Sequence, residues 1–266
     1  LGEESLKDKV IYIYPEQGHG DFIHCFRYLS LVKDLKPKKI ILEVTEPFYE
    51  LIRVQDEDIE VIQQNKKIPK FDFYCPIMSL PYAFKTDLSN IPSKNSYLSL
   101  NRLNELKDKI NDNDKFKVGI CWAGNPQHKN DHNRSMAMDE MIPLLSMPFE
   151  FHSLQKQIDL KNQKILKKYK IVDLHKKIDN FSDTATFVNM MDIVISVDTV
   201  IAHLAGALGK KTFLLLPNKS SFLWMDGRKD SPWYPTIKIF RQKSLGNWES
   251  PIGEIMKELK ACYKNK

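Results

Sequence analysis

The sequence predicts an α/β fold made of two βαβ-type domains that face each other. Short runs of β-branched and aromatic residues alternate with helical segments in both halves of the chain. The polar stretch Asn111–Lys115, NDNDK, interrupts this alternation and is the best domain boundary. We therefore expect an N-terminal domain over residues 1–112, a C-terminal domain over residues 113–250 and a final helical segment over residues 251–266.

The N-terminal half begins with an apolar strand, a turn that contains two glycines and an amphipathic helix. Periodicity and turn residues predict strands at Val10–Tyr14, Lys39–Val44, Ile59–Ile62 and Phe71–Cys75 and helices at Phe22–Leu35, Pro47–Arg53 and Asn101–Ile110. Segment 76–100 contains several prolines and little periodicity, so we expect long loops there.

The C-terminal half restarts the alternation of strands and helices. The patterns predict strands at Lys117–Trp122, Phe149–Leu154, Ile171–Asp173, Ile193–Val197, Thr212–Leu216 and Ile237–Arg241 and helices at Met138–Leu145, Ala185–Met191, Ala202–Leu208 and Ile252–Tyr263. In the segment Ile193–Pro217, two apolar runs flank a helix of small residues that Gly209 ends. This β-turn-α-β unit places polar residues where its first strand gives way to the helix.

Composition excludes several functional classes. The chain has 266 residues, of which 42% are hydrophobic, and no run approaches the roughly 20 apolar residues of a membrane span. The net charge of +6 comes from scattered lysines, so no nucleic-acid partner is expected. The four cysteines form no CxxC pair, which indicates a reducing, cytoplasmic compartment. No secretory signal is visible, and the chain begins without Met, which is compatible with its being a segment of a longer protein.

Several polar residues follow predicted strands and can converge, because the carboxyl ends of parallel strands share one edge of a sheet. They are Asp21, Asn125, Lys129, Arg134, Gln155, Lys156, Asp198 and Thr199. Lys129 or Arg134 could supply positive charge for a phosphate. Asp198 could accept hydrogen bonds from sugar hydroxyls, and Thr199 opens a helix whose N-terminus suits a phosphate.

Two of the polar positions have both a structural and a chemical interpretation. Asp21 follows Gly18 and Gly20 and could cap the next helix or act as a general base. His203 lies on an apolar helix and could be a core histidine or a ligand contact. No GxGxxG follows Tyr14, which argues against a dinucleotide dehydrogenase.

A metal site is not expected from the histidines. His128, His132 and His152 lack the spacing of a metal-ligand set. We expect no metal ion and no other cofactor. The aromatic residues Trp224 and Trp233 are interpreted as packing residues.

At the level of longer motifs, the chain resembles glycosyltransferase family 9, the heptosyltransferase-like family, and the glycosyltransferase domain often found in bacterial tetratricopeptide-repeat proteins. The resemblance covers nearly the whole chain, in order. It rests on EQGHGDFIHCFRYL, FDFYCPIMSLPYAF, VGICWAGNPQHKNDHNRSM, FHSLQK, DNFSDTATFVNMMDIVISVDTVIAHLAGALGKKTFLLLP, DSPWYPTIKIFRQ and GNWESPI.

The resemblance implies a GT-B fold, with two Rossmann-like domains, a cleft between them, a small N-terminal domain and a C-terminal helix that crosses back to it. It implies sugar transfer from a nucleotide sugar to an acceptor hydroxyl without a metal. Asp21 matches the catalytic base. The donor-binding residues implied are Gly18, Gly20, Asn125, Lys129, Arg134, Gln155, Lys156, Asp183, Thr184, Asp198, Thr199 and His203.

The chain departs from the heptosyltransferase pattern at Val200, where those enzymes usually have glycine after the Asp-Thr pair. Its N-terminal half is also short, and acceptor recognition depends mainly on that half. The acceptor therefore stays open among a glycan, lipopolysaccharide and a protein. Upstream tetratricopeptide repeats and peripheral contact with the inner membrane are compatible with the resemblance. The alternatives are a non-catalytic nucleotide-sugar or protein-binding module and a nucleotide-sugar epimerase.

Overall fold

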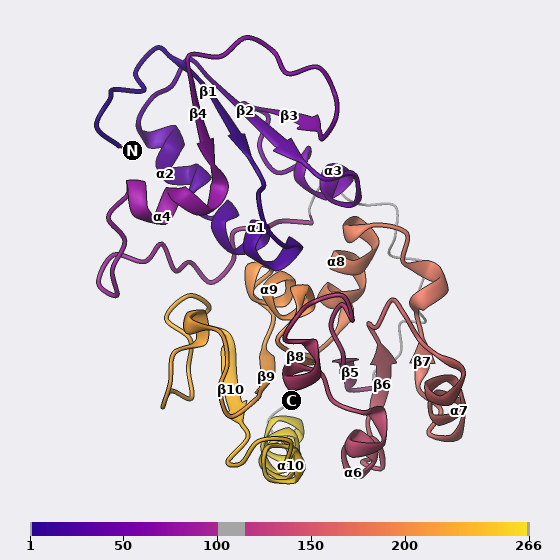
Figure 1. Ribbon diagram of the computed structural model, residues 1–266. Helices are drawn as coiled ribbons and strands as arrows, with labels where there is room; N and C mark the ends of the chain where they lie inside the picture. Colours follow the sequence, from indigo (N-terminus) through magenta and orange to yellow (C-terminus); the bar gives the residue numbers. More distant parts are fainter. Residues whose placement is uncertain (1, 101–114, 265–266) are drawn as a thin grey trace.

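The computed structural model describes residues 2–100 and 115–264 and contains two parallel sheets, one in each half of the chain (Figure 1). This arrangement confirms the predicted two-domain α/β fold. The predicted helix Asn101–Ile110 and the boundary between residues 112 and 113 lie outside the described residues.

The N-terminal sheet has the strand order β3-β2-β1-β4, with all neighbouring strands parallel. Its apolar residues are buried: Ile40, Ile41, Leu42 and Val44 of the second strand are all shielded from solvent. The elements are β1 (Val10–Tyr14), α1 (His19–Phe26), α2 (Leu29–Asp34), β2 (Lys39–Val44), η1 (Glu46–Phe48), α3 (Tyr49–Ile52), β3 (Ile59–Gln63), β4 (Phe73–Pro76), η2 (Ile77–Ser79) and α4 (Leu80–Ala83).

The predicted helix Phe22–Leu35 is two helices in the structure, and it starts earlier. α1 begins at His19, so the glycine-containing turn is shorter than expected. The helix is interrupted after Phe26, where the Tyr28 backbone N–H donates to the carbonyl oxygen of Cys25 rather than to the residue one position earlier. This tighter turn redirects the chain before α2 begins.

The C-terminal sheet has the order β10-β9-β8-β5-β6-β7 and is also parallel. Counted from β5, this is the strand order 3-2-1-4-5-6 of a Rossmann fold, whose order reverses between β5 and β8. The elements are β5 (Lys117–Cys121), α5 (Asp131–Arg134), η4 (Met138–Met141), α6 (Ile142–Leu145), β6 (Glu150–Ser153), α7 (Leu160–Lys168), β7 (Val172–Asp173), η5 (His175–Lys177), α8 (Phe181–Met190), β8 (Ile193–Val197), α9 (Val200–Ala207), β9 (Thr212–Leu216), η6 (Phe222–Trp224), β10 (Ile237–Arg241) and α10 (Glu249–Lys264).

The two domains pack closely against each other. α1 lies against α9, and α3 lies against α8, as Figure 1 shows. The rings of Phe48 and Phe181 stack across this interface with their centroids 4.0 Å apart. The segment that follows α4 also crosses to the C-terminal domain, where the backbone N–H groups of Tyr97 and Leu98 donate to the carbonyl oxygen of Ala207. The domains therefore share one apolar core.

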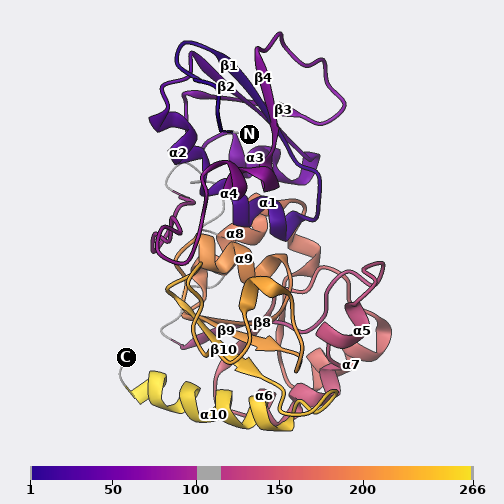
Figure 2. The same cartoon turned by 60° about the vertical axis from the view of Figure 1, so that its left-hand side comes forward.

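The last helix does not pack back toward the N-terminal domain, so this expectation is wrong for the described residues. α10 packs on α6 and β10, and its buried residues Ile252, Ile255 and Leu259 join the apolar cluster of the C-terminal domain. Figure 2 shows α10 at the end of the molecule farthest from the N-terminal sheet. Its apolar stripe lies on the face of the C-terminal sheet that carries Phe213 and Phe240.

No helix within residues 2–100 or 115–264 has the length and apolar character needed to cross a membrane. All four cysteines are free thiols, and three of them, Cys25, Cys75 and Cys121, are buried.

Gly20→Ala should lower the free energy of unfolding by about 1–3 kcal/mol, because it adds a methyl group to a packed interface. A Cβ at Gly20 would lie 2.7 Å from Cδ2 of His203, which is shorter than a van der Waals contact between two carbon atoms. Gly253→Ala in α10 is the control, since a Cβ there meets nothing within 4 Å. That variant should gain about 0.5–1 kcal/mol through helix propensity. Urea unfolding checks both values, and equal responses at the two positions would contradict the close packing of α1 on α9.

Candidate functional site

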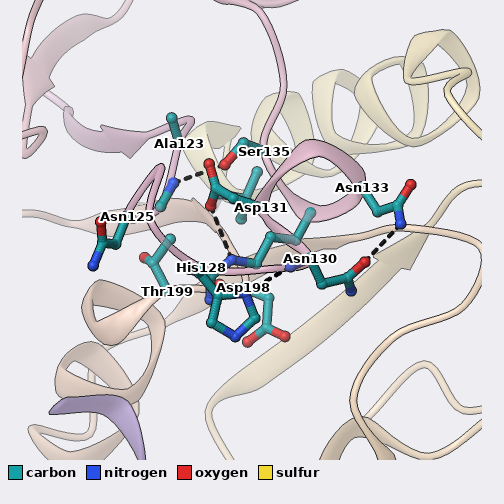
Figure 3. Close-up of polar contacts among 12 residues, drawn as sticks. Ala123, Asn125, His128, Asn130, Asp131, Asn133, Ser135, Asp198 and Thr199 are labelled. Atoms are coloured by element: carbon teal, nitrogen blue, oxygen red, sulfur yellow. Dashed lines mark hydrogen bonds and ion pairs between the residues drawn. The ribbon is translucent and has the colours of Figure 1, made fainter. Parts of the chain in front are cut away.

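The candidate site lies at the switch point of the C-terminal sheet, where the loops after β5 and β8 meet. Arg134 links these loops: its Nε donates to Oδ1 of Asp131 at 3.0 Å, and its Nη1 donates to the backbone carbonyl of Asp198 at 3.0 Å. Figure 3 shows Asp131, His128 and Asp198 grouped at this point. The guanidinium is thus held in place at the carboxyl edge of the sheet, where open α/β sheets bind ligands.

The loop after β5 is organised by short-range hydrogen bonds. The Gln127 N–H donates to Oδ1 of Asn125, and the Asn130 N–H donates to Nδ1 of His128. The Gly124 N–H donates to Oγ of Ser135 at 2.8 Å and so joins the two ends of the loop. These Asx-type contacts explain why a polar sequence adopts an ordered turn here.

Gly124 permits the close approach of Arg134. A Cβ at this position would lie 2.6 Å from both Nη2 of Arg134 and Oδ1 of Asp131. A side chain at residue 124 would therefore displace the ion pair. The glycine in the sequence AGNP is required by packing rather than by a left-handed backbone angle.

The loop after β8 leads directly into α9, and Thr199 caps this helix. Oγ1 of Thr199 accepts from the Ile201 N–H at 3.3 Å and lies 3.1 Å from Oγ of Ser196. Thr199 is buried, so its hydroxyl stabilises the helix start. The N-terminus of α9, with its partial positive charge, follows Asp198 at the edge of the site.

Asp21 approaches the same site from the N-terminal domain. It lies in the first turn of α1, where its Oδ2 accepts from the Gly18 N–H at 3.1 Å. Burial raises the pKa of the Asp21 carboxyl, while the Gly18 N–H, the His128 ring and the Arg134 guanidinium oppose this rise. The helix cap at this turn is Gly18, and Asp21 supports it from inside the helix.

The charges of Asp21 and Asp198 act on each other across the domain boundary. Burial raises the pKa of the Asp198 carboxyl, the Trp224 indole and Arg134 oppose that rise, and Asp21 adds to it. Arg134 and His128 lower the pKa of both carboxyl groups. The fold therefore brings two carboxylates and two basic groups from three distant segments to one place.

His203 is buried at the interface between α1 and α9. Its Nδ1 lies 2.8 Å from the hydroxyl of Tyr234. Burial, with Arg27 and Arg134 adding to it, lowers the pKa of the His203 ring to about 3, so the imidazole is neutral. The structure thus places His203 in the core.

Gln155 and Lys156 have structural partners next to the site. The Gln155 amide donates to the backbone carbonyl of Ala123 and accepts from the Ala123 N–H, which fixes the end of β5. Nζ of Lys156 donates to the backbone carbonyls of His175 and Ile178. Both side chains support loops that border the site, and their direct contact with a nucleotide stays a prediction.

Asp183 and Thr184 belong to the start of α8, which packs against the N-terminal domain. The Asp183 carboxylate accepts from the N–H groups of Asp179 and Asn180, and the Thr184 hydroxyl donates to the Asn180 carbonyl. Asn125 and Lys129 are exposed on the loop after β5. Their role in donor binding, like that of Asp183 and Thr184, stays a prediction.

His128 is a site residue that the sequence reasoning missed. The sequence presents His128 only as a possible metal ligand, because a single imidazole in a polar loop carries no further signal. Within the described ranges, 2–100 and 115–264, no three His, Cys, Asp or Glu side chains group as a metal site would require.

No family model matches the chain. A curated relative, the protein FlbA of Caulobacter vibrioides, is 21% identical over 97% of this chain and 47% of its own length. The chain therefore spans about half of that relative.

Two solved structures share the arrangement of both domains. Glycosyltransferase family 9 from Veillonella parvula has a TM-score of 0.66 at 10% identity, with 99% of each chain covered. TibC of enterotoxigenic Escherichia coli, described as an iron-containing dodecameric glycosyltransferase, has a TM-score of 0.64 at 14% identity, with 93% of this chain and 67% of TibC covered. The chain has the fold of these glycosyltransferases. TibC has also been solved with ADP-D-β-D-heptose.

Proposed function

We propose that this chain is a glycosyltransferase of the family 9 type, which moves a sugar from a nucleotide-sugar donor to an acceptor hydroxyl. The observation that carries the proposal is the position of Asp21. This carboxylate lies on α1 of the N-terminal domain, which packs against α9 directly after the switch point of the other domain. Its charge raises the pKa of Asp198 there. A base on one domain and a phosphate-binding edge on the other are what such a transfer needs.

The C-terminal edge is suited to the donor diphosphate. Arg134 offers a fixed guanidinium, which suits the paired oxygens of a phosphate better than a flexible ammonium would. The N-terminus of α9 adds partial positive charge beside it. Together they stabilise the negative charge that develops on the departing nucleoside diphosphate. The carboxylate of Asp198 is available to accept from a hydroxyl of the donor.

Asp21 is suited to activate the acceptor. As the acceptor oxygen attacks the anomeric carbon, its proton passes to the Asp21 carboxylate, and the bond between that carbon and the diphosphate oxygen breaks. Burial raises the pKa of Asp21 and makes its carboxylate a stronger base. Gly18 holds the carboxylate in position through its backbone N–H.

The proposal includes transfer without a bound metal ion, with Arg134 in the role that a divalent cation has in other glycosyltransferases. The iron in the description of TibC makes this a point to test. We place the activity in the cytoplasm, where free thiols such as those of the four cysteines persist.

Incubation with a panel of nucleoside diphosphates and nucleotide sugars tests the function directly. A matching nucleotide should raise the melting temperature, because it binds the native state alone. The matching nucleotide sugar should release nucleoside diphosphate when an acceptor glycan, lipopolysaccharide or protein is added. Chelation by EDTA should leave this turnover unchanged, and added iron should not increase it. If EDTA abolishes turnover, only the metal-free mechanism is refuted, and the transferase function itself is not.

A binding module without turnover is the second candidate. The small N-terminal domain, whose sheet has four strands in the described residues, favours it, because acceptor recognition depends on that domain. Thermal stabilisation by a nucleotide sugar, with neither transfer nor hydrolysis for any acceptor class, would support this candidate. A change of configuration in the bound sugar, without its release, would instead indicate an epimerase.

A further inference from the structure

Arg27 is a buried cation at the C-terminal end of α1, and only 3% of its surface is exposed. Its Nε donates to the His24 carbonyl at 2.8 Å, within the N-terminal domain. Its Nη1 donates to the Trp233 carbonyl of the C-terminal domain, and its Nη2 donates to the hydroxyl of Tyr97 at 3.2 Å. One guanidinium therefore joins both domains and the segment that connects them.

Aromatic rings surround this guanidinium. Its central carbon lies 4.5 Å from the ring centroid of Tyr234, 4.7 Å from that of Tyr97 and 5.6 Å from that of Trp233. In the part of the chain that the structure describes, no Asp or Glu forms an ion pair with Arg27. Burial of a charge without a counter-ion costs free energy that an apolar side chain would avoid. A specific geometric role for Arg27 would explain this cost.

Tyr97 extends the connection between the domains. Its backbone N–H donates to the Ala207 carbonyl at the end of α9, and its hydroxyl donates to the Ile23 carbonyl of α1 at 3.0 Å. Tyr97 thus holds one helix from each domain, and Arg27 holds Tyr97.

The aromatic residues around Arg27 also connect it to Gly20, the residue before Asp21. The Tyr234 ring covers Arg27, and its hydroxyl lies 2.8 Å from Nδ1 of His203. The His203 ring is neutral and therefore carries a single ring proton. When Nδ1 accepts a hydrogen bond from the Tyr234 hydroxyl, that proton lies on Nε2, the ring nitrogen that faces Gly20. Contacts therefore run continuously from Arg27 through Tyr234 and His203 to Gly20.

We propose that Arg27 is a positioning residue, which holds α1 against α9 and thereby fixes the position of Asp21 relative to the loops that carry Arg134 and Asp198. The proposal rests on the proposed transferase function for its kinetic consequence, but its structural part is independent of any activity. The hydrogen bonds of Arg27 go to neither the donor edge nor Asp21. Its loss should therefore affect the alignment of the two half-sites rather than either half alone.

Arg27→Met tests this role, because methionine fills space without the charge or the three hydrogen bonds. We expect kcat to fall roughly tenfold, while the Kd for the nucleoside diphosphate stays within about threefold of the original. Arg27→Lys should not restore kcat, because an ammonium lacks the planar fork that reaches Trp233 and Tyr97 together. Tyr234→Phe, which keeps the ring, should show a smaller loss. Arg53→Met is the matched control, since Arg53 pairs with Glu50 at the surface.

Amide hydrogen exchange supplies a readout that needs no transfer activity. In Arg27→Met, exchange should accelerate in α1 and in the segment around Tyr97, while β5 and β8 keep their protection. If the original protein transfers no sugar but exchange in Arg27→Met accelerates selectively in this way, the transferase proposal fails, whereas the role of Arg27 in holding α1 against α9 is supported. Unchanged protection of α1 in Arg27→Met, or full kcat in that variant, would overturn the proposed role of Arg27. If Arg27→Met does not fold, Arg27→Lys, which keeps the charge but lacks the planar fork, is measured instead, and the same two outcomes decide.

Discussion

Asp21→Asn should lower kcat for sugar transfer by roughly 10²- to 10⁴-fold, because a positioned general base contributes that much to a reaction rate. The amide retains an oxygen that accepts from the Gly18 N–H, so the first turn of α1 should keep its structure. The donor edge lies in the other domain, and the Kd for the nucleoside diphosphate should stay within about threefold. Steady-state kinetics and nucleotide titration check the two parts.

The pKa of Asp21 makes the stability of this variant predictable in sign. Burial raises the folded-state pKa above the ordinary value of 3.8, so the folded protein holds this proton more tightly than the unfolded chain does. Ionisation of Asp21 therefore lowers stability as pH rises from 3.8 through the folded pKa, and the full cost is present above that pKa. Asp21→Asn removes the cost, so above the folded pKa its free energy of unfolding should equal or exceed that of the original protein.

Asp159→Asn is the matched control for this substitution. Asp159 caps α7, where its Oδ1 accepts from the Asn162 N–H at 2.7 Å, and it lies outside the candidate site. This variant should retain full kcat. The rate of the original protein should fall on the acid side of a pKa above 3.8, and Asp21→Asn should lack that limb. Full transfer by Asp21→Asn would exclude Asp21 as the base.

Arg134→Ala should weaken nucleoside diphosphate binding by roughly 10- to 150-fold, because hydrogen bonds to charged groups contribute about 1.5–3 kcal/mol. Two effects combine in this loss. The phosphate loses its guanidinium partner, and the loops after β5 and β8 lose the hydrogen bond between Arg134 and the Asp198 carbonyl. Isothermal titration measures the Kd directly.

Lys129→Ala tests whether the positive charge of the loop is sufficient for phosphate binding or whether the position of the Arg134 guanidinium is required. Lys129 is exposed on the same loop, and its removal changes the net charge by the same amount. Its Kd should change by no more than about threefold, since exposed charges are screened by solvent. Arg134→Lys should recover only part of the affinity, because lysine cannot donate to Asp131 and Asp198 and also bind a phosphate in a bidentate manner. Equal losses in Lys129→Ala and Arg134→Ala would reject Arg134 as the specific phosphate ligand.

Much of the fold can be read from the sequence, because parallel strands buried on both faces form continuous apolar runs. Val10–Tyr14, Lys39–Val44 and Ile193–Val197 are strands at the predicted boundaries. Helix boundaries are harder to predict, since tertiary contacts decide them. The interruption of the predicted helix after Phe26 lies next to Arg27, which turns into the domain interface and has no sequence pattern of its own.

Part of the candidate site could also be predicted from the sequence, because strand ends can be located there. Strand ends identified Asp21, Arg134 and Asp198, and the shared edge of a parallel sheet explains why they converge. The choice between Lys129 and Arg134 could not be made, because both lie in one polar loop with no periodicity. His128 and the partners of Gln155 depend on how that loop folds back on β5, which side-chain hydrogen bonds decide.

The sequence by itself therefore determined the two sheets, the position of the segment Ile193–Pro217 and the strand-end carboxylates, since these follow from local periodicity. Only the tertiary structure decided that α1, which carries Asp21, packs on α9 beside Asp198, that Arg134 is the cation held between the two loops, and that α10 covers the C-terminal sheet. These features depend on contacts between residues far apart in the chain. Such contacts arise from the packing of α1 on α9 and the burial of apolar faces, which no local pattern encodes.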